Sequence, residues 1–388
     1  MNRSEGNAVV KLVDNLIASA LEHGASDIHL EPERDKLRVR FRVDGILCTQ
    51  DDIDVSLANQ VASRIKILSN IDVAKKRVPQ DGKFQIHSDD SLIDFRVSTF
   101  PGLYGENIVI RILDRGAHSI SLGHLGFSPR IRSSFENLIR RSQGFFLVSG
   151  PTGSGKTTTL YAALSDLNSP DVNIITLEDP VEYDIKGVTQ GQINPAAGFT
   201  FEKGMRALLR QDPDIVMLGE IRDKQTAQIA IEAALTGHLV FSTVHANNAS
   251  SVVMRLMDMG IEPFLINAAL TGVLAQRLAR RICDDCKVEY KPNEQERAIL
   301  DALHIATNVL YRGAGCATCH NHGYKGRIGI FELLTISNEL RSLIIECPAY
   351  EAIETQARTD GMRTLMEDGV QKVQDGLITL QELARVVS

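Results

Sequence analysis

The sequence lacks the features that would place it in a membrane or outside the cell. No apolar run approaches the roughly 20 residues that a membrane-spanning helix needs. The first residues, MNRSEGNAVVKL, contain neither the apolar segment nor the cleavage site of a signal peptide. We therefore expect the protein to stay in the cytoplasm.

An excess of positive charge is also missing. Lys and Arg number 42 against 49 Asp and Glu, a net charge of −7. No overall basic field would attract nucleic acid or an anionic membrane. Internal repeats and low-complexity tracts are absent too. The 388 residues, 43% hydrophobic and 23% charged, predict an ordinary globular protein of two or three domains.

Cysteine is scarce, but four of the six cysteines form two C-x-x-C pairs. In a cytosolic protein this spacing indicates a metal rather than disulfides. Four thiolates suit a closed, structural Zn²⁺ site, although the loop between the pairs is longer than in common zinc ribbons. The alternative is four free thiols in a reducing cytosol. We expect Cys48 and Cys347 to be buried and unreactive. The predicted zinc ligands are Cys283, Cys286, Cys316 and Cys319.

Residues 1–113 predict a small α+β domain. Helical spacing of apolar residues covers 8–22 and 57–71, and alternation with a period of two predicts strands between Ile28 and Val43. The arginines at 38, 40 and 42 would share one face, which we interpret as a solvated strand face rather than a ligand or subunit contact. An Asp81–Gly82 turn is expected before two further strands, IDFRVSTF and NIVIRIL.

The rest of the chain predicts an α/β domain. A Gly- and Ser-rich linker at 114–124 leads into strand–loop–helix units, the signature of a parallel sheet covered by helices. We assign 125–280 to this core, 281–330 to the cysteine region and 331–388 to a C-terminal helical part. The buried strands are expected at Phe145–Ser149, Ile174–Leu177, Ile215–Leu218 and Leu239–Thr243.

The segment GPTGSGKT matches the phosphate-binding loop G-x-x-x-x-G-K-[ST], between a strand and a helix. Its glycines let backbone N–H groups converge on a phosphate, and the helix N-terminus adds positive charge. Lys156 would reach the β- and γ-phosphates of ATP, and Thr157 would bind Mg²⁺. The predicted nucleotide-binding residues are Gly150, Pro151, Thr152, Gly153, Ser154, Gly155, Lys156, Thr157 and Thr158.

Two acidic residues follow buried strands and would complete an ATPase site. Glu220 follows Ile215–Leu218, a strand that we expect beside the phosphate-loop strand, and Glu178 ends the strand of ITLEDPVEY. We assign Glu220 to Mg²⁺ and Glu178 to the attacking water, although these roles could be exchanged. His245, after a fourth strand, could sense the γ-phosphate or contact the acids, whereas such a histidine is more often structural.

Several longer motifs resemble the secretion ATPase superfamily, and within it the assembly ATPases of type II secretion and type IV pilus systems. They are LRQDPDIVMLGEIRD, ITLEDPVEY, TGHLVFSTVHANN, ASDIHLEP, RVPQDGKF and RVSTFPGLYGENIVIRIL. The resemblance implies a hexameric ring of subunits, each with a PAS-like N-terminal domain, a linker and a RecA-like ATPase domain. ATP cycles would move the two domains and act on an inner-membrane platform protein.

The tetracysteine segment resembles that of type II secretion members, which we favour over the alternative of type IV pilus extension. A hexameric nucleic-acid motor is disfavoured by the acidic balance. Family members also carry a further N-terminal domain that docks on a membrane anchor at the inner membrane. Because this chain starts just before the ASDIH block, we expect either a truncated chain or a different mode of docking.

The resemblance also implies a set of phosphate-sensing arginines. Arg96 and Arg111 match the pair in the N-terminal domain, and Arg111 lies on a largely apolar strand, where it should need an anionic partner. A fixed guanidinium would stabilise charge on the γ-phosphoryl oxygens. For any one of these arginines, a structural salt bridge is nearly as good an explanation. The matching arginines of the ATPase core are Arg206, Arg210 and Arg222. The resemblance also raises His245 as a catalytic candidate.

Overall fold

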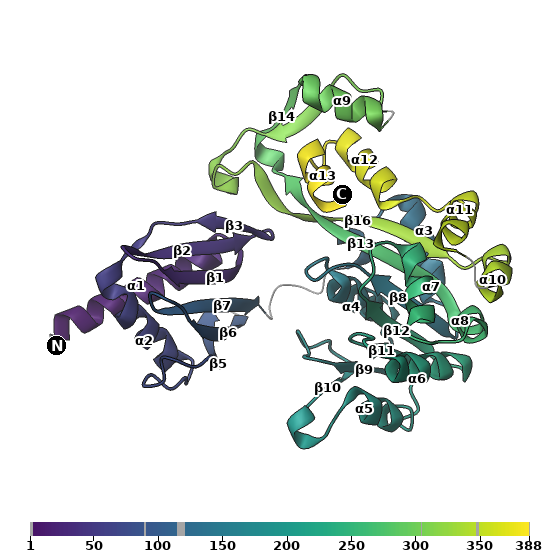
Figure 1. Ribbon diagram of the computed structural model, residues 1–388, viewed down its shortest axis with the longest axis horizontal. Helices are drawn as coiled ribbons and strands as arrows, with labels where there is room; N and C mark the ends of the chain where they lie inside the picture. Colours follow the sequence, from purple (N-terminus) through teal and green to yellow (C-terminus); the bar gives the residue numbers. More distant parts are fainter. Residues whose placement is uncertain (1–2, 89–90, 115–120, 304, 347–348, 388) are drawn as a thin grey trace. The chain divides into compact units, whose positions relative to one another are not determined.

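The computed structural model describes the whole chain except residues 1–2, 89–90, 115–120, 304, 347–348 and 388 (Figure 1). It divides into two compact units, residues 1–118 and 119–388. Cys347 and most of the expected linker fall outside the described residues. Within the described residues, no helix has both the length and the apolar run that a bilayer crossing requires.

The first unit is an antiparallel sheet with two helices packed on one face (Figure 1), as predicted for an α+β domain. Inward-facing side chains such as Ile28, Phe95 and Ile110 are fully buried against the helices. The strand order is β3-β2-β1-β7-β6-β5, with β4 paired to β2. The elements are α1 (Arg3–Glu22), β1 (Ala25–Pro32), β2 (Lys36–Val43), β3 (Ile46–Thr49), β4 (Ile53–Asp54), α2 (Ala58–Leu68), β5 (Gln80–Ser88), β6 (Ser91–Pro101) and β7 (Glu106–Asp114).

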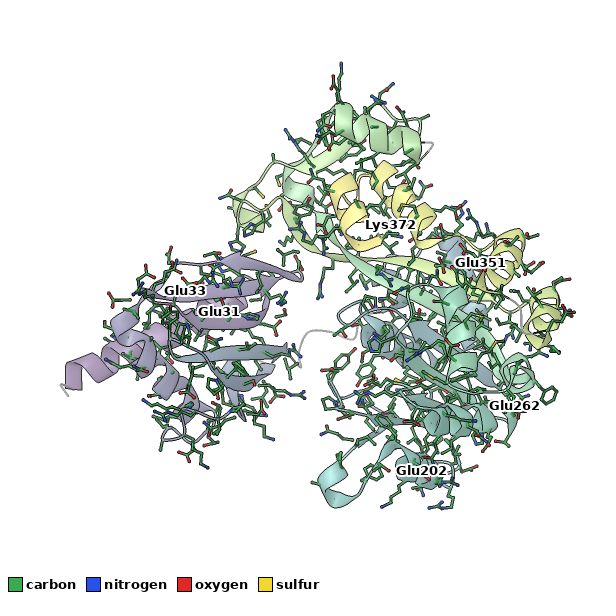
Figure 2. All side chains as sticks on the ribbon, viewed as in Figure 1. Glu31, Glu33, Glu202, Glu262, Glu351 and Lys372 are labelled. Carbon is green, nitrogen blue, oxygen red and sulfur yellow. The ribbon has the colours of Figure 1, made fainter. Side chains whose placement is uncertain are left out.

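The β1–β2 hairpin has the predicted apolar and basic faces. Three apolar side chains that alternate with the arginines of β2, Leu37, Val39 and Phe41, are at most 2% exposed. On the other face, Arg38 and Arg40 form ion pairs with Glu31, which is labelled in Figure 2. The arginines are therefore neutralised by neighbours within the sheet, which supports the interpretation of a solvated strand face.

The predicted turn at Asp81–Gly82 is wrong. Both residues lie inside β5, where they pair with Ser98 and Val97 of β6. A Cβ atom on Gly82 would lie 2.4 Å from the carbonyl oxygen of Ser69. The glycine thus allows a close approach between this edge strand and the end of α2, and does not form a turn.

The second unit is a mostly parallel sheet between two layers of helices (Figure 1). Its strand order is β10-β9-β11-β12-β8-β13-β16, with β16 antiparallel at one edge. Helices α3 and α4 pack on one face, and α5 to α8 with the C-terminal helices pack on the other. The four predicted buried runs form β8, β9, β11 and β12, so the α/β prediction is confirmed.

The core elements of this unit are α3 (Pro129–Ile139), β8 (Gly144–Ser149), α4 (Lys156–Leu167), β9 (Ile174–Glu178), β10 (Thr189–Gln192), α5 (Phe201–Leu208), β11 (Ile215–Leu218), α6 (Lys224–Leu235), β12 (Leu239–Val244), α7 (Ala249–Asp258) and α8 (Pro263–Ala269). They are followed by β13 (Leu270–Ile282), β14 (Lys287–Tyr290), α9 (Glu294–Ala302), β15 (Leu310–Gly313), β16 (Tyr324–Thr335), α10 (Asn338–Ile345), α11 (Tyr350–Thr359), α12 (Leu365–Gln374) and α13 (Leu380–Val387).

The neighbours of the phosphate-loop strand differ from the prediction. We expected β11 beside β8, but β12 lies between them. Crossover connections decide the order of parallel strands, and apolar runs do not encode that order. The other neighbour of β8 is β13, a 13-residue strand that the apolar pattern did not reveal because Gln276 and Arg277 interrupt it. β13 and β16 cross the boundaries expected at 280 and 330.

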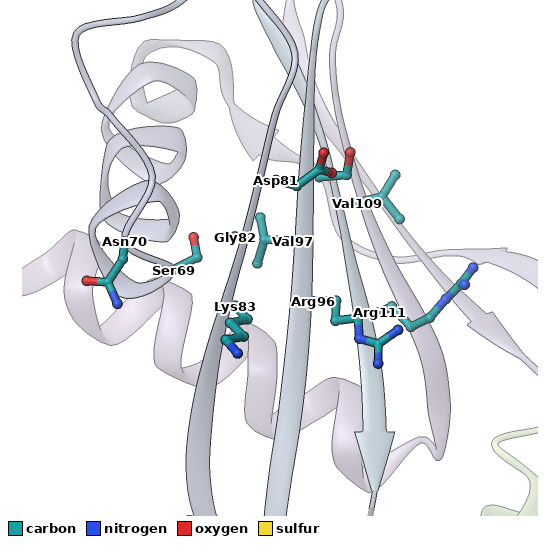
Figure 3. A pocket seen from close by; sticks show the side chains of 10 residues that line it. Ser69, Asn70, Asp81, Gly82, Lys83, Arg96, Val97, Val109 and Arg111 are labelled. Carbon is teal, nitrogen blue, oxygen red and sulfur yellow. The ribbon is translucent and has the colours of Figure 1, made fainter. Parts of the chain in front are cut away.

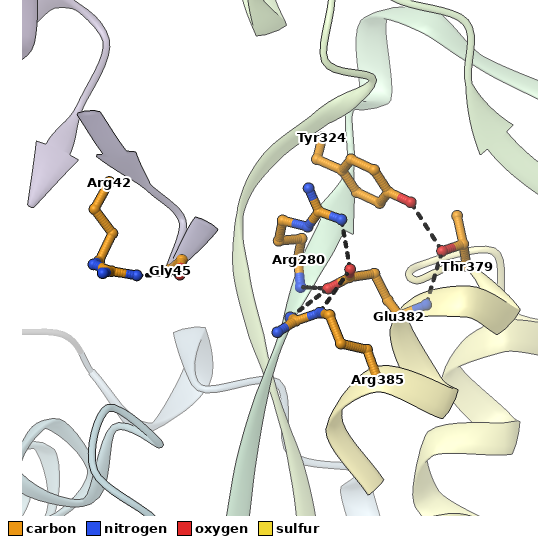
Figure 4. A network of polar contacts seen from close by, with 7 residues as sticks. All are labelled: Arg42, Gly45, Arg280, Tyr324, Thr379, Glu382 and Arg385. Carbon is orange, nitrogen blue, oxygen red and sulfur yellow. Dashed lines mark hydrogen bonds and ion pairs between the residues drawn. The ribbon is translucent and has the colours of Figure 1, made fainter. Parts of the chain in front are cut away.

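A buried ion-pair network attaches the last helix to this sheet (Figure 4). Glu382 of α13 has a side chain only 2% exposed, and its carboxylate accepts hydrogen bonds from Arg385 and from Arg280 of β13. The Arg280 guanidinium also lies 4.1 Å from the centre of the Tyr324 ring. Burial alone would raise the pKa of Glu382, but the two guanidinium groups lower it to about 2.

Candidate nucleotide site and cysteine centre

The phosphate loop joins β8 to α4, which begins at Lys156. Gly153 and Gly155 have φ values of +78° and +85°, which favour glycine and let the backbone curl. The Lys156 ammonium donates to the carbonyl oxygens of Gly150 at 2.9 Å and Pro151 at 3.0 Å. Burial lowers the pKa of Lys156, Glu220 opposes this shift and Arg277 adds to it. The loop is therefore already curled around the lysine that would meet a phosphate. Thr157 and Thr158 occupy the first turn of α4.

Glu178 is enclosed at the end of β9. It is 2% exposed, and its carboxylate accepts hydrogen bonds from the hydroxyl of Tyr161, from Thr176 at 2.5 Å and from Gln190 at 3.3 Å. Burial and the neighbouring carboxylate raise the pKa of Tyr161. Glu178 thus connects α4, β9 and β10. Tyr161 and Gln190 were not anticipated, because Tyr161 occupies an apolar position in the TTTLYAAL helix.

Glu220 lies beyond the end of β11, the strand next to β9. Its side chain is 20% exposed, forms an ion pair with Arg222 and lies 3.7 Å from His245 Nε2. Glu220 raises the pKa of Arg222, and its negative charge also favours the protonated form of Lys156. Of the two acids, Glu220 is therefore the one open to solvent. A second histidine, His238, precedes β12 and contacts the carbonyl oxygen of Ala233.

A pocket of about 510 Å³ opens beside the phosphate loop. Gly150 and Pro151 line it from the loop, His245 from the end of β12, and Ser251 and Arg255 from α7. The histidine that we predicted as a catalytic candidate therefore lines a pocket beside the phosphate loop.

The other predicted arginines of this unit lie on or just after α5. Arg206 is 62% exposed and pairs with Glu202 at 3.5 Å, which is the structural salt bridge that the sequence left open. Arg210 donates to the carbonyl oxygen of Arg206. Among the contacts of the described residues, Arg222 pairs with Glu220, whereas Arg206 and Arg210 contact neither Glu178 nor Glu220.

Arg96 and Arg111 lie together in the first unit. They are cross-strand partners on β6 and β7, and they line a pocket of about 770 Å³ on this sheet (Figure 3). Arg111 has the expected anionic partner, Asp27 at 3.0 Å, but its side chain is 64% exposed because it faces away from the core. Lys83 pairs with Arg96 in register and lines the same pocket, so three cationic residues form one row across the sheet. We call Lys83, Arg96 and Arg111 the cationic row. Lys83 was not among the site residues predicted from the sequence.

The four paired cysteines converge between β13 and β16. Their sulfur atoms all lie within 4.8 Å of one another, with separations of 3.7 to 3.9 Å for three of the pairs. A tetrahedral site with Zn–S bonds of about 2.3 Å requires sulfur separations of about 3.8 Å, so the set fits Zn²⁺. Backbone N–H groups of Gly315, Cys316 and Gly323 donate to two of the sulfurs. Although burial opposes it, the N–H groups of Cys316 and Gly323 hold the pKa of Cys319 at about 7, while burial raises that of Cys286 to about 12.

The RecA-like sheet and the G-x-x-x-x-G-K-T loop between β8 and α4 define a P-loop ATPase. A family model described as "Type II/IV secretion system protein" matches residues 2–385, and the chain belongs to this family, which confirms the resemblance drawn from the motifs. The four-cysteine cluster is part of this fold and could hold a metal ion.

Named relatives cover almost the whole chain. It is 47% identical to the type II secretion system ATPase E of Vibrio cholerae serotype O1, over 99% of this chain and 76% of that protein. It is 46% identical to the type IV pilus assembly ATPase PilB of Thermus thermophilus, over 98% of this chain and 43% of that protein.

Solved structures share the fold. The pilus retraction motor PilT with bound ADP is similar with a TM-score of 0.62 and 25% identity, over 95% of both chains. The ATPase DotB of Legionella pneumophila has a TM-score of 0.70 at 18% identity, over 96% of this chain and 94% of that chain.

Proposed function

We propose that the protein is the ATPase motor of a type II secretion system, which hydrolyses ATP to drive pseudopilus assembly and protein export. The observation that carries this proposal is the identity of 44–47% to type II secretion ATPases over nearly the whole length of the chain. The chain also has a complete phosphate loop and an acidic residue at the ends of two strands. The alternative is type IV pilus extension, because the identity to the Thermus protein is also 46%.

Within the site, Lys156 and the loop amides would bind the β- and γ-phosphates of ATP. Thr157 and Glu220 would hold Mg²⁺, which neutralises developing charge when it is bound. Glu178 would orient the attacking water. The water would use the acceptor site that Glu178 Oε2 keeps beside its hydrogen bond from Tyr161, since Oε1 already accepts from Thr176 and Gln190.

The cationic row would supply positive charge to the phosphates from the first unit. Asp27 pairs with Arg111, whereas in the described part of the chain Lys83 and Arg96 have no carboxylate partner. Two uncompensated cations beside a pocket favour an anionic ligand. We infer that ATP draws this row toward a phosphate loop, and that this movement is the motor's stroke.

The remaining proposals concern assembly. The subunits would form a hexameric ring in the cytoplasm, held at the inner membrane by the platform protein and by the cytoplasmic domain of a membrane anchor. Zn²⁺ would be bound by Cys283, Cys286, Cys316 and Cys319 and would fix the local fold without taking part in the chemistry. Nucleic acid is not expected as a partner.

Deletion of the gene in its host tests the proposed function. Secreted enzymes should disappear from the medium while surface pili remain, and the intact gene, but not a Lys156→Ala allele, should restore secretion. Loss of pili with normal secretion would support the pilus alternative instead. Stimulation of ATP hydrolysis by DNA at physiological salt would contradict both.

A further inference from the structure

Gln276 of β13 faces the phosphate loop, although no motif singled it out. Its side chain is buried, at 2% exposure. Its Nε2 donates to the carbonyl oxygen of Ser154 at 2.7 Å, and its Oε1 accepts from the Thr159 hydroxyl at 2.7 Å. A carbonyl oxygen can only accept, so the amide orientation is fixed by this pair of contacts. One side chain thus joins β13, the phosphate loop and the first turns of α4.

This contact sets the plane of a peptide bond in the loop. In a trans peptide, the carbonyl oxygen of Ser154 and the N–H of Gly155 point in opposite directions. The hydrogen bond that draws the oxygen toward Gln276 therefore turns the Gly155 N–H away from β13. Glycine is favoured at Gly155 by its φ of +85°, and a Cβ atom would also lie 2.8 Å from Gln276 Nε2.

We propose that Gln276 is a positioning residue for nucleotide binding. It holds the Ser154–Gly155 peptide so that the Gly155 N–H is presented to a phosphate oxygen, and Thr159 holds the carboxamide in that orientation. Gln276 acts through the loop and does not touch the nucleotide. The proposal needs only that the loop binds ADP or ATP, and so it is independent of which secretion or pilus system the protein serves.

The test measures the affinity of the full chain for Mg·ADP by calorimetry. Gln276→Leu removes both hydrogen bonds, and its dissociation constant should rise about 10-fold, the loss typical of one hydrogen bond to a charged group. Thr159→Val should give a smaller rise of about 3-fold. Thr159→Ser keeps the hydroxyl and should bind like the wild type.

Thr271→Val is the matched control. Thr271 lies on the same strand, is also buried, and donates a hydrogen bond to the carbonyl oxygen of Phe145, outside the phosphate loop. This variant should lower the melting temperature about as much as Gln276→Leu and leave the affinity for Mg·ADP unchanged. An equal loss of affinity in both variants would show a general effect of loosening the sheet and would overturn the proposal.

AMP provides a second readout, because it lacks the β-phosphate that a phosphate loop holds. Gln276→Leu should narrow the affinity difference between ADP and AMP, whereas an equal loss for both nucleotides contradicts the proposal. If Gln276→Leu does not fold, the Thr159 pair decides: equal affinities of Thr159→Val and Thr159→Ser for Mg·ADP would refute the positioning role.

Discussion

At the scale of single residues, the buried carboxylates of Glu178, Glu332 and Glu382 are each held by several donors. Glu178 accepts from two hydroxyls and an amide, Glu382 from two guanidinium groups, and Glu332 from the backbone N–H groups of Ala249 and Leu365 at the starts of α7 and α12. A buried carboxylate without such partners would be too costly. Glu220 differs, because its side chain is partly exposed beside the phosphate loop.

This difference predicts distinct effects for the two acids. Glu220→Gln should lower kcat by about 100-fold or more and leave nucleotide affinity within a few fold, as expected when a carboxylate that holds the catalytic Mg²⁺ is lost. Glu178→Gln should lower kcat and also the melting temperature, because the new amide cannot accept from every present donor. Steady-state phosphate release and thermal melts measure both. Full turnover in Glu220→Gln would show that Glu220 does not hold Mg²⁺.

Glu382 predicts a pH-dependent contribution to stability. Its pKa in the folded protein is about 2, against an ordinary value of 4.5, so the network stabilises the fold above pH 4.5 and is lost as the pH falls from 4.5 toward 2. Glu382→Gln should reduce the free energy of unfolding by up to about 3 kcal/mol at neutral pH. Denaturant titrations should show this deficit shrinking below pH 4.5. A deficit that does not depend on pH would contradict the ion-pair explanation.

At the scale of elements, β13 organises the second unit. Thr271 bonds to β8, Gln276 to the phosphate loop and Arg280 to the last helix, and the strand ends immediately before Cys283, the first cysteine of the cluster. A single strand therefore connects the nucleotide site with the cysteine centre. β13 runs across position 280, where we expected the core to end.

The cysteine centre predicts one zinc ion per chain. Cys319→Ser should lose the metal, because a neutral hydroxyl replaces a thiolate ligand, and should lower the melting temperature. Cys48→Ser, which changes a cysteine of the first unit, is the control and should keep both the metal and the stability. Metal analysis by mass spectrometry after purification under reducing conditions measures this. Wild-type protein without zinc would contradict the prediction.

At the scale of the whole molecule, the chain places cationic residues on one unit and a phosphate loop on the other. The first unit carries the cationic row on an exposed sheet face, and the second carries the loop and both acids. Among the described residues, Lys83 and Arg96 have no carboxylate partner, and such cations favour an anionic ligand. In the proposed motor that ligand is the triphosphate.

Substitutions in the cationic row test whether its cations contribute to ATP turnover. Arg96→Ala and Arg111→Ala should each lower kcat/KM for ATP by about 10-fold or more, because each removes a cation that would offset phosphate charge. Arg38→Ala, which changes an arginine paired with Glu31 and Glu33 in the same unit, should keep near-normal activity. Turnover measured at equal protein concentration compares them. Normal activity of both row variants would make Arg96 and Arg111 structural residues.

The sequence by itself determined the four buried strands of the ATPase core, the phosphate loop and the cysteine pairs. These features depend on local spacing: a period of two or 3.6, a glycine-lined loop before a helix, and two C-x-x-C turns. Glu178 and Glu220 could be predicted for the same reason, since Glu178 follows a buried run directly and Glu220 follows one after Gly219.

Only the tertiary structure decided the order of the strands and the partners of each acid. It placed β12, not β11, beside β8, brought Gln276 to the phosphate loop across 122 positions of sequence, and put Lys83 in register with Arg96. Such contacts join segments distant in the chain, and they depend on crossovers and packing that no local pattern records.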